Sequence, residues 1–327
     1  MTSGTALVTG AAGFIGRAAV LRLAEAGFNV RAGLRKTPLD HGIKVAVAPI
    51  ACDLDDPEQI RRAVSGADLV VHAAYGADGG MAAQCDRLLA AMAAEGVGGL
   101  VYLSSIAVYG ARTGQITEAD GPIGDPGAYG AAKLACEALV RDWTAAAPDR
   151  RAVILRPGVV YGRDSVLWVG KMLERIRIGA LRDLGEAASA PAPLVHVDDL
   201  AQAILLAARN VSGPIPGMAS AAAINIVGPE TPSWRDYFAA LAAQAGAPPL
   251  RPAGAVEQAF ARTLAFPAKA WASLGFPGLR RYALAPAEGE LALFRRDARF
   301  SNEQAERLLG FRPTVSLAEG LRRSVGP

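Results

Sequence analysis

A chain of 327 residues is long enough for one large domain or two modest ones with a substantial core. The net charge of +3 comes without a basic run of the kind that binds nucleic acids, so no nucleic-acid partner is expected. No apolar stretch approaches the ~18–20 residues needed to span a bilayer, which argues against stable membrane insertion.

Cysteine and histidine usage argues against a metal site. Cys52, Cys85 and Cys136 lack metal-ligand spacing, and the three histidines lie far apart along the chain. We therefore expect reduced thiols, no metal, and satisfied structural histidines. The chain also enters a predicted strand at once, which leaves no room for a signal peptide, so a cytoplasmic protein is expected.

The chain opens with a strand, a glycine-rich turn and a helix. Ala6–Thr9 has the pattern of a buried strand, the turn carries Gly10, Gly13 and Gly16, and Arg17–Ala26 repeats apolar residues at helical spacing. Glycines let the backbone approach a pyrophosphate, and a helix N-terminus offers free N–H groups. The turn predicts a dinucleotide site, although its spacing differs from Gly-x-Gly-x-x-Gly. The alternative is a tight turn without a ligand.

The end of the second strand bears on the choice of dinucleotide. NAD-preferring sites place an Asp or Glu about 20 residues after the glycines, where it binds the ribose 2′-hydroxyl. Here the strand at Asn29–Leu34 is followed by Arg35 and Lys36. Because a guanidinium can bind a 2′-phosphate through two hydrogen bonds, we predict NADP (NADPH) rather than NAD. The alternative is that both cations are solvated on a turn.

Tyr129 and Lys133 lie four residues apart, so on a helix they share one face. A phenol has an ordinary pKa near ~10, and a nearby ammonium group lowers it. A tyrosine with a lowered pKa can pass a proton to or from a substrate oxygen near neutral pH. The spacing is common by chance, but downstream of a dinucleotide turn it predicts a catalytic pair.

Strands and helices alternate to about residue 160, which predicts an α/β fold with a doubly wound parallel sheet. Further buried strands are expected at Val45–Ala51, Leu69–Ala73, Leu100–Ser104 and Val153–Arg156. The alternation returns with a strand at Leu194–Val197 and a helix that Asp198 and Asp199 would cap. We predict a dinucleotide-binding Rossmann domain of residues 1–161 plus 194–210 and a smaller substrate-binding domain of residues 162–193 plus 211–327.

Several motifs, in this order, resemble the extended short-chain dehydrogenase/reductases of the NAD(P)-dependent epimerase/dehydratase family. They are Thr9–Gly16, Asp53–Leu54, His72–Ala74, Ser104–Gly110, Tyr129-x-x-x-Lys133, Arg156–Gly162 and Val195–Ala201. The resemblance covers residues 5–210, and the tail from about residue 211 carries weaker signals.

The resemblance implies that Ser105 and Tyr129 bind the substrate oxygen, while Lys133 holds the ribose hydroxyls and lowers the pKa of Tyr129. Ser104 is the competing serine. The implied cofactor-binding residues are Gly10, Gly13, Phe14, Ile15, Gly16, Arg35, Lys36, Asp53, Leu54, Ala73, Ala74, Tyr129, Lys133, Pro157, Gly158 and Val159. Asp53 would bind the adenine amine, unless it forms an Asx-turn, and residues 157–159 would meet the carboxamide through their backbone.

The segment Arg156–Gly162 looks most like the branch of 3β-hydroxysteroid dehydrogenase and dihydroflavonol reductase. Val159 stands where nucleotide-sugar enzymes usually have an Asn, and Ile106–Ala107 stands where sugar dehydratases have acidic residues. We expect an NADP-dependent oxidoreductase that interconverts a carbonyl and an alcohol on a small apolar substrate by hydride transfer, with Tyr129 as proton donor or acceptor. Substrate contacts are expected from Tyr75, Ile106, Tyr161 and Trp168.

Two alternatives stay open. One is a nucleotide-sugar epimerase that uses bound NAD, and the other is an NADP-binding sensor or scaffold protein without turnover, against which the intact Ser105, Tyr129 and Lys133 argue. Apolar side chains of the second domain suit an apolar substrate, although core packing is the commoner role for such residues: Trp168, Met172, Trp234, Phe260, Phe266 and Trp271. The resemblance also implies a homodimer formed by helices at about 81–95 and 130–146.

Overall fold

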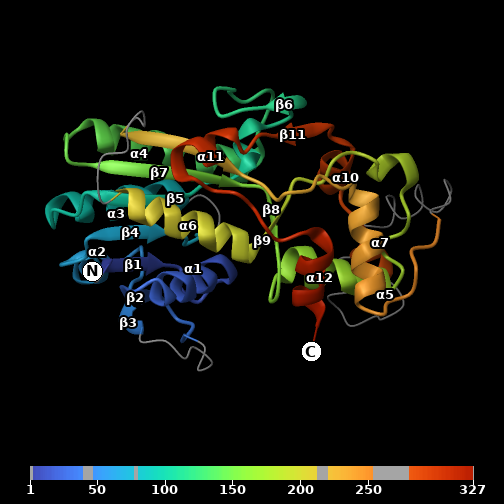
Figure 1. Ribbon diagram of the computed structural model, residues 1–327, viewed down its shortest axis with the longest axis horizontal. Helices are drawn as coiled ribbons and strands as arrows, with labels where there is room; N and C mark the ends of the chain where they lie inside the picture. The colour runs from blue at the N-terminus through green and yellow to red at the C-terminus, as the bar shows by residue number, and fades with distance from the viewer. Residues whose placement is uncertain (1–2, 40–46, 77–79, 212–219, 253–279, 327) are drawn as a thin grey trace.

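The computed structural model describes residues 3–39, 47–76, 80–211, 220–252 and 280–326. Its larger part is a seven-stranded parallel sheet with the strand order β10-β7-β5-β4-β1-β2-β3 (Figure 1). These strands are β1 (Ser3–Thr9), β2 (Phe28–Leu34), β3 (Val47–Ala51), β4 (Leu69–His72), β5 (Gly99–Leu103), β7 (Arg151–Pro157) and β10 (Ala221–Ile226). The order reverses between β1 and β4, where ligands of such sheets bind outside the carboxyl ends of the strands. The predicted doubly wound α/β fold is confirmed.

Helices cover both faces of this sheet (Figure 1). One face packs against α1 (Phe14–Glu25), α6 (Val197–Val211) and α11 (Glu303–Leu309), and the other against α2 (Pro57–Val64), α3 (Met81–Ala94) and α4 (Gly127–Ala145). The second half of strand β1 shows why it is an apolar run. Ala6 and Val8 enter one core, whereas Leu7 enters the other, so these three positions do not face water.

A smaller lobe lies beyond the carboxyl ends of the strands (Figure 1). It contains α5 (Lys171–Arg177), α7 (Trp234–Gln244), α9 (Arg280–Ala283), α10 (Glu288–Arg295) and α12 (Leu317–Val325). Its core is aromatic, because the ring of Phe294 lies 4.8 Å from that of Trp234 and 5.1 Å from that of Phe238 between centroids. Trp234 and Met172 are fully buried, so they serve the core. Phe260, Phe266 and Trp271 lie outside the described residues.

Short strands join the lobe to the sheet domain. Strand β8 (Val159–Tyr161) pairs with β9 (Leu194–His196), and β6 (Gly114–Ile116) pairs with β11 (Ala298–Phe300). A π-helical turn at Val166–Gly170 leads into α5, and a 3-10 turn occupies Gly185–Ala188.

The division between the two parts differs from the expected one. Strand β10 is the edge strand of the large sheet, and α11 packs on the same core through Ala305 and Leu309. Residues 221–226 and 303–311 therefore belong to the sheet domain, not to the smaller lobe. A strand pattern shows that Ile224 and its neighbours are extended, but it does not show which sheet the strand joins.

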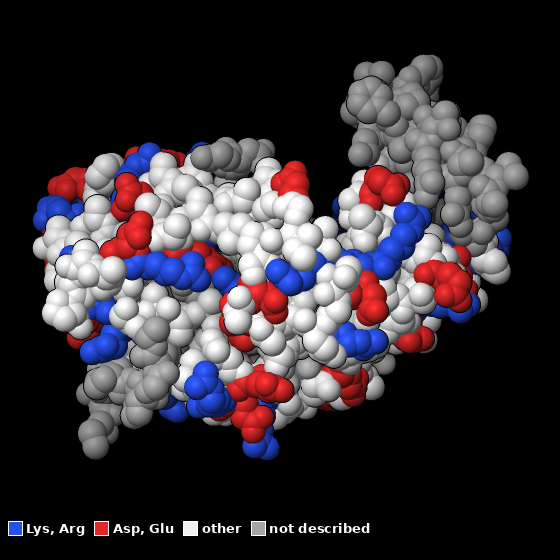
Figure 2. Space-filling model, turned by 90° about the horizontal axis from the view of Figure 1, so that it is seen from above, with Lys and Arg blue, Asp and Glu red and all other residues white. Residues whose placement is uncertain are grey.

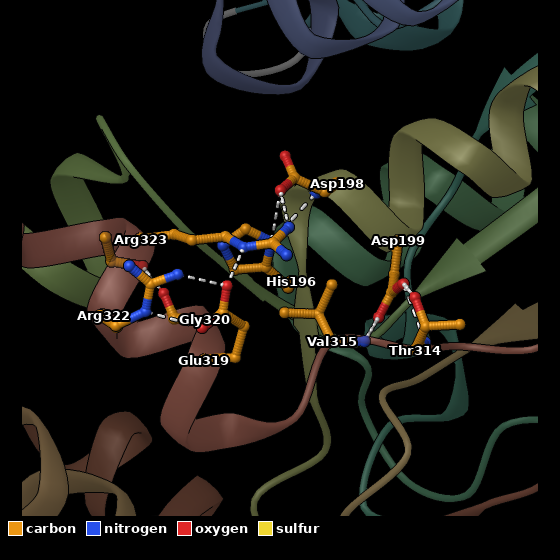
Figure 3. Close-up of polar contacts among 10 residues, drawn as sticks. His196, Asp198, Asp199, Thr314, Val315, Glu319, Gly320, Arg322 and Arg323 are labelled. Carbon is orange, nitrogen blue, oxygen red and sulfur yellow. Dashed lines mark hydrogen bonds and ion pairs between the residues drawn. The ribbon is translucent and has the colours of Figure 1, made fainter.

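The C-terminal segment is bound to the start of α6 (Figure 3). Asp199, which is buried, accepts hydrogen bonds from the backbone N–H groups of Thr314 and Val315, both at 3.0 Å. Asp198 bonds to Arg323 of α12 at 2.8 Å, and its hydrogen bond with His196, helped by Arg323, lowers its pKa to about 2. The expectation that both aspartates cap α6 is wrong, because both lie within its first turn and their side chains bond to His196 and to the C-terminal segment.

Candidate active site

A cleft of about 1160 Å³ opens between the sheet domain and the smaller lobe. Figure 2 shows the molecule hollowed between the two lobes, with acidic and basic side chains interspersed on that face. The cleft collects twelve of the residues predicted from the sequence, and these come from six separate segments of the chain: Phe14, Ile15, Ala73, Tyr75, Ser105, Ile106, Tyr129, Lys133, Pro157, Gly158, Val159 and Trp168.

The glycine turn is required by the close approach of backbone segments. Gly10 has φ +68°, and a Cβ there would lie 2.6 Å from the Cα of Ala74, which follows β4. A Cβ on Gly16 would lie 2.1 Å from the carbonyl oxygen of Gly10, so only glycine lets α1 pack this closely onto β1. Gly13 is the N-cap of α1 and provides no side-chain hydrogen bond. The first N–H groups of α1 thus lack intrahelical partners and fit a pyrophosphate.

Arg35 and Lys36 lie directly after β2, at the carboxyl edge of the sheet, and both side chains are exposed. Neither makes an ion pair with any residue in the part of the chain that the structure describes. Asp53 is half-buried and Leu54 is buried. One carboxylate oxygen of Asp53 accepts from the N–H of Asp55 at 3.1 Å, so the Asx-turn considered for Asp53 is present.

Ser105 and Tyr129 both line the cleft, and the Ser105 side chain is near enough to the Tyr129 hydroxyl to affect its pKa. Ser105 caps the 3-10 helix Ile106–Tyr109, and its Oγ also accepts from the N–H of Ala107 at 3.1 Å. Tyr129 lies in the first turn of α4, is 40% exposed, and has its ring 5.6 Å from that of Tyr75. The pair can therefore present two hydroxyl groups to one substrate oxygen.

Lys133 lies one turn further along α4 and is 5% exposed. Its Nζ donates to the carbonyl oxygen of Leu103 at 2.6 Å and lies 5.8 Å from the ring centroid of Tyr129. Burial lowers the pKa of Lys133 to about 8. The expected lowering of the pKa of Tyr129 is not found, because desolvation raises it more than the nearby Ser105 side chain lowers it.

The competing serine, Ser104, has a different partner. Its Oγ donates at 2.6 Å to Glu137, which is fully buried. Glu137 also binds Arg156 through two hydrogen bonds of 2.9 and 2.6 Å, and Arg156 in turn donates to the hydroxyl of Tyr109. This buried network holds Ser104 away from Tyr129 and supports the assignment of Ser105 to the site.

Two of the expected contacts are restricted by the backbone. The N–H of Gly158 donates to the carbonyl oxygen of Ile226 at 2.9 Å, and the N–H of Val159 donates to that of Pro193 at 2.7 Å. These donors are thus already used, and a nicotinamide carboxamide cannot rely on them. Tyr161 does not line the cleft. It is 2% exposed, and its ring packs edge-on against His196, so the structure does not support a substrate contact.

The two histidines in the described ranges are buried, but only one of them is satisfied. The Nδ1 of His72 bonds to the hydroxyl of Thr9 at 2.7 Å, and burial lowers the pKa of His72 to about 3. The Nε2 of His196 is buried and has no hydrogen-bond partner within the described ranges, contrary to expectation. His41 lies outside the described residues. Within the same ranges no cluster of metal-ligating side chains occurs, and no helix has the length and apolarity to cross a membrane.

Residues 6–222 match the model of the NAD-dependent epimerase/dehydratase family. The chain belongs to this family. It is an extended short-chain dehydrogenase/reductase, as the motifs predict. Among curated members, a 2-alkyl-3-oxoalkanoate reductase of Stenotrophomonas maltophilia is 32% identical over 97% of both chains.

Other members of the family have different activities. An N-acetyl-α-D-glucosaminyl-diphospho-ditrans,octacis-undecaprenol 4-epimerase of Escherichia coli O157:H7 is 28% identical over 63% of both chains. Among solved structures, MoeE5 in complex with UDP-glucuronic acid and NAD has a TM-score of 0.74 and 25% identity, and the match covers 98% of both chains. The chain is therefore similar to a reductase and to nucleotide-sugar enzymes.

One wall of the cleft could not be predicted from the sequence. Ala292, Leu293, Arg295 and Arg296, at the end of α10, line it together with Val166 and Leu167. The helical pattern near residue 290 and the basic pair were visible in the sequence. Nothing in their spacing places them across the cleft from Ser105, because that depends on how the lobe docks on the sheet.

Proposed function

We propose that this protein is an NADP-dependent oxidoreductase that interconverts a ketone and an alcohol on an apolar carboxylic acid of the 2-alkyl-3-oxoalkanoate type. The observation that carries the proposal is that Ser105, Tyr129 and Lys133 come together in one cleft whose exposed side chains are largely apolar. The similarity to a 2-alkyl-3-oxoalkanoate reductase over 97% of the chain supports it.

The residues of the cleft suit a proton transfer coupled to hydride transfer. When bound, a reduced nicotinamide cofactor supplies the hydride. Ser105 and Tyr129 hydrogen-bond the carbonyl oxygen, and Tyr129 donates its proton as that oxygen becomes a hydroxyl. In the oxidative direction the phenol oxygen takes the proton back. Lys133 provides a positive charge beneath the tyrosine, next to the position expected for the ribose.

Arg35 supports NADP over NAD. Its exposed guanidinium follows β2 directly, has no carboxylate partner in the described segments, and no acidic residue stands in Leu34–Lys36. A 2′-phosphate is the part of NADP that such a side chain can bind through two hydrogen bonds.

The cleft mouth supports alkyl chains on the substrate. Among described residues, five large hydrophobic side chains are strongly exposed, and four of them line this cleft: Tyr75 at 64%, Tyr129 at 40%, Val166 at 81% and Leu167 at 47%. Exposed apolar side chains that gather at one site usually mark a binding surface. Two alkyl chains on neighbouring carbons would cover this area.

The direct test follows NADPH consumption with freshly prepared 2-hexyl-3-oxodecanoate. We expect turnover with NADPH, much weaker turnover with NADH, and a shift of preference toward NADH in Arg35→Asp. Tyr129→Phe should bind NADPH normally yet lose turnover by on the order of 10²–10⁴-fold, since only the transferable proton is removed. Equal use of both cofactors by the wild type would contradict the NADP assignment.

The second candidate is a nucleotide-sugar epimerase that retains NAD. The similarity to the 4-epimerase and to MoeE5 favours it. It predicts stoichiometric NAD⁺ in the denatured protein and interconversion of UDP-sugars without net oxidation of NADPH. Either result, without reduction of the oxo acid, would replace the reductase proposal.

A further inference from the structure

Arg296 lines the catalytic cleft and forms no ion pair with any residue that the structure describes. It is the C-cap residue of α10 and is half-buried. Its Nη1 donates to the carbonyl oxygen of Gly110, and its guanidinium lies 5.9 Å from the ring centroid of Phe300. No carboxylate among the described residues pairs with it, so most of its five N–H donors have no partner there. Burial lowers the pKa of this arginine.

The two fully buried arginines among the described residues are paired with carboxylates. Arg156 bonds to Glu137 at 2.6 Å, and Arg175 forms a double hydrogen bond with Glu290 at 2.7 and 2.8 Å. Arg295, which also lines the cleft, is exposed and lies 3.4 Å from Glu288. Removing a charge from water without a partner is costly, so a half-buried arginine at a ligand cleft suggests that the ligand supplies the anion.

The anchor of Arg296 is close to the reacting groups. Gly110 is the residue that ends the 3-10 helix capped by Ser105, and a helix of four such residues is on the order of 8 Å long. The hydrogen bond from Arg296 to Gly110 therefore ties the lobe to the loop that carries the catalytic hydroxyl. In a 3-oxo acid only one carbon separates the ketone from the carboxylate, so a cation that recognises the carboxylate must lie near this loop.

We propose that Arg296 binds the carboxylate of the substrate and so selects 3-oxo and 3-hydroxy acids over their neutral esters. This inference rests on the proposed reductase function, since it assigns a role within the same cleft. The planar guanidinium matches a carboxylate through two parallel hydrogen bonds. It acts by binding and orienting the acid, whereas Ser105 and Tyr129 act on the oxygen at C3.

The test uses the oxidative direction, because a 3-hydroxy acid is stable in water whereas a 3-oxo acid loses carbon dioxide. Wild type, Arg296→Gln and Arg296→Lys are assayed with NADP⁺ and either 2-hexyl-3-hydroxydecanoate or its methyl ester. In Arg296→Gln we expect kcat/KM for the acid to fall on the order of 10²-fold, mainly through KM, with little change for the ester. Arg296→Lys should recover part of the loss. Arg299→Gln is the matched control, because Arg299 is exposed on β11 and does not line the cleft.

Equal losses for acid and ester in Arg296→Gln, or a wild type that does not distinguish them, would overturn the inference. A selective loss in Arg295→Gln instead would move the role to the neighbouring residue. Binding is measured separately, by titrating the NADPH complex with the hydroxy acid and with UDP and following NADPH fluorescence. If the protein binds the acid through Arg296 but does not turn it over, the proposed reductase function is refuted and the carboxylate role of Arg296 stands. If UDP binding depends on Arg296, the residue binds a diphosphate and the carboxylate role is overturned.

Discussion

The adjacent residues Ser104 and Ser105 have different partners, and this difference predicts different effects of their removal. Ser105 lies with Tyr129 in the cleft, whereas Ser104 donates to the buried Glu137. We expect Ser105→Ala to lower kcat by on the order of 10²-fold or more with little change in stability. Ser104→Ala should instead lower the free energy of unfolding by about 1–3 kcal/mol, because a buried carboxylate loses a donor. Urea unfolding and NADPH-linked assays of both variants check this, and the reverse pattern would exchange their roles.

The low pKa of Lys133 predicts how activity depends on pH. Burial places this pKa near 8, so the ammonium group loses its charge as the pH rises through that value. The pKa of Tyr129 is raised, so the phenol keeps its proton over the same range. Reduction should therefore decline above about pH 8 through loss of the lysine charge, not of the tyrosine proton. The profile of kcat/KM for the methyl ester of the oxo acid, which does not ionise in this range, measures it, and a flat profile to high pH would contradict it.

Single residues were predictable where their role depends on local spacing. Tyr129 and Lys133 share a helix face, and the glycines follow a strand, so both groups could be recognised in the sequence. The raised pKa of Tyr129 could not be recognised in the sequence, because it reflects desolvation by groups that are distant in the chain. Arg296 was missed for a similar reason: what makes it notable is the absence of a carboxylate partner among the described residues, and partners are set by tertiary packing.

At the scale of elements, the attachment of the C-terminal segment to α6 rests on one buried carboxylate. Asp199 accepts from Thr314 and Val315, and its replacement by Ala leaves two backbone donors without that partner (Figure 3). We expect Asp199→Ala to lower the free energy of unfolding by about 1–3 kcal/mol and to speed hydrogen exchange in residues 314–325.

The neighbouring Asp198 provides the matched control for this prediction. Its side chain is 51% exposed, and it bonds to Arg323 at the surface. Exposed ion pairs contribute little, so Asp198→Ala should change stability by only about 0–1 kcal/mol. If both variants lose a similar free energy of unfolding, the burial of Asp199 does not explain its contribution to stability.

The elements themselves were well predicted, and the reason is the double covering of the sheet. A strand buried on both faces is a continuous apolar run, so Leu69–His72 and Arg151–Pro157 were recognisable within a few residues. That β10 belongs to the large sheet was not predictable, because its first residues, Ala221–Ala223, continue a run rich in Gly, Pro and Ala that has the composition of a linker. Only the register of Ile224 against Leu155 shows that this strand completes the sheet.

On the scale of the whole molecule, α3 and α4 lie side by side and present small side chains to solvent. The exposed alanines of the two helices are Ala83, Ala90, Ala94, Ala128, Ala131, Ala135, Ala138 and Ala145. Alanines let helix backbones approach closely, and two copies of this face would form a four-helix bundle around a two-fold axis. The homodimer expected from the family resemblance would use this surface.

Light scattering tests the dimer directly. We expect the wild type to have twice the monomer mass at micromolar concentration and Ala135→Arg to be monomeric, because a long charged side chain prevents the close approach of the helices. Ala239→Arg is the control, since Ala239 is an exposed alanine on α7, in the other lobe. It should stay dimeric. A monomeric wild type, or a dimer that tolerates arginine at residue 135, would exclude this surface. Because Tyr129 and Lys133 lie on α4, we also expect the monomeric variant to lose part of its activity as that helix loses its support.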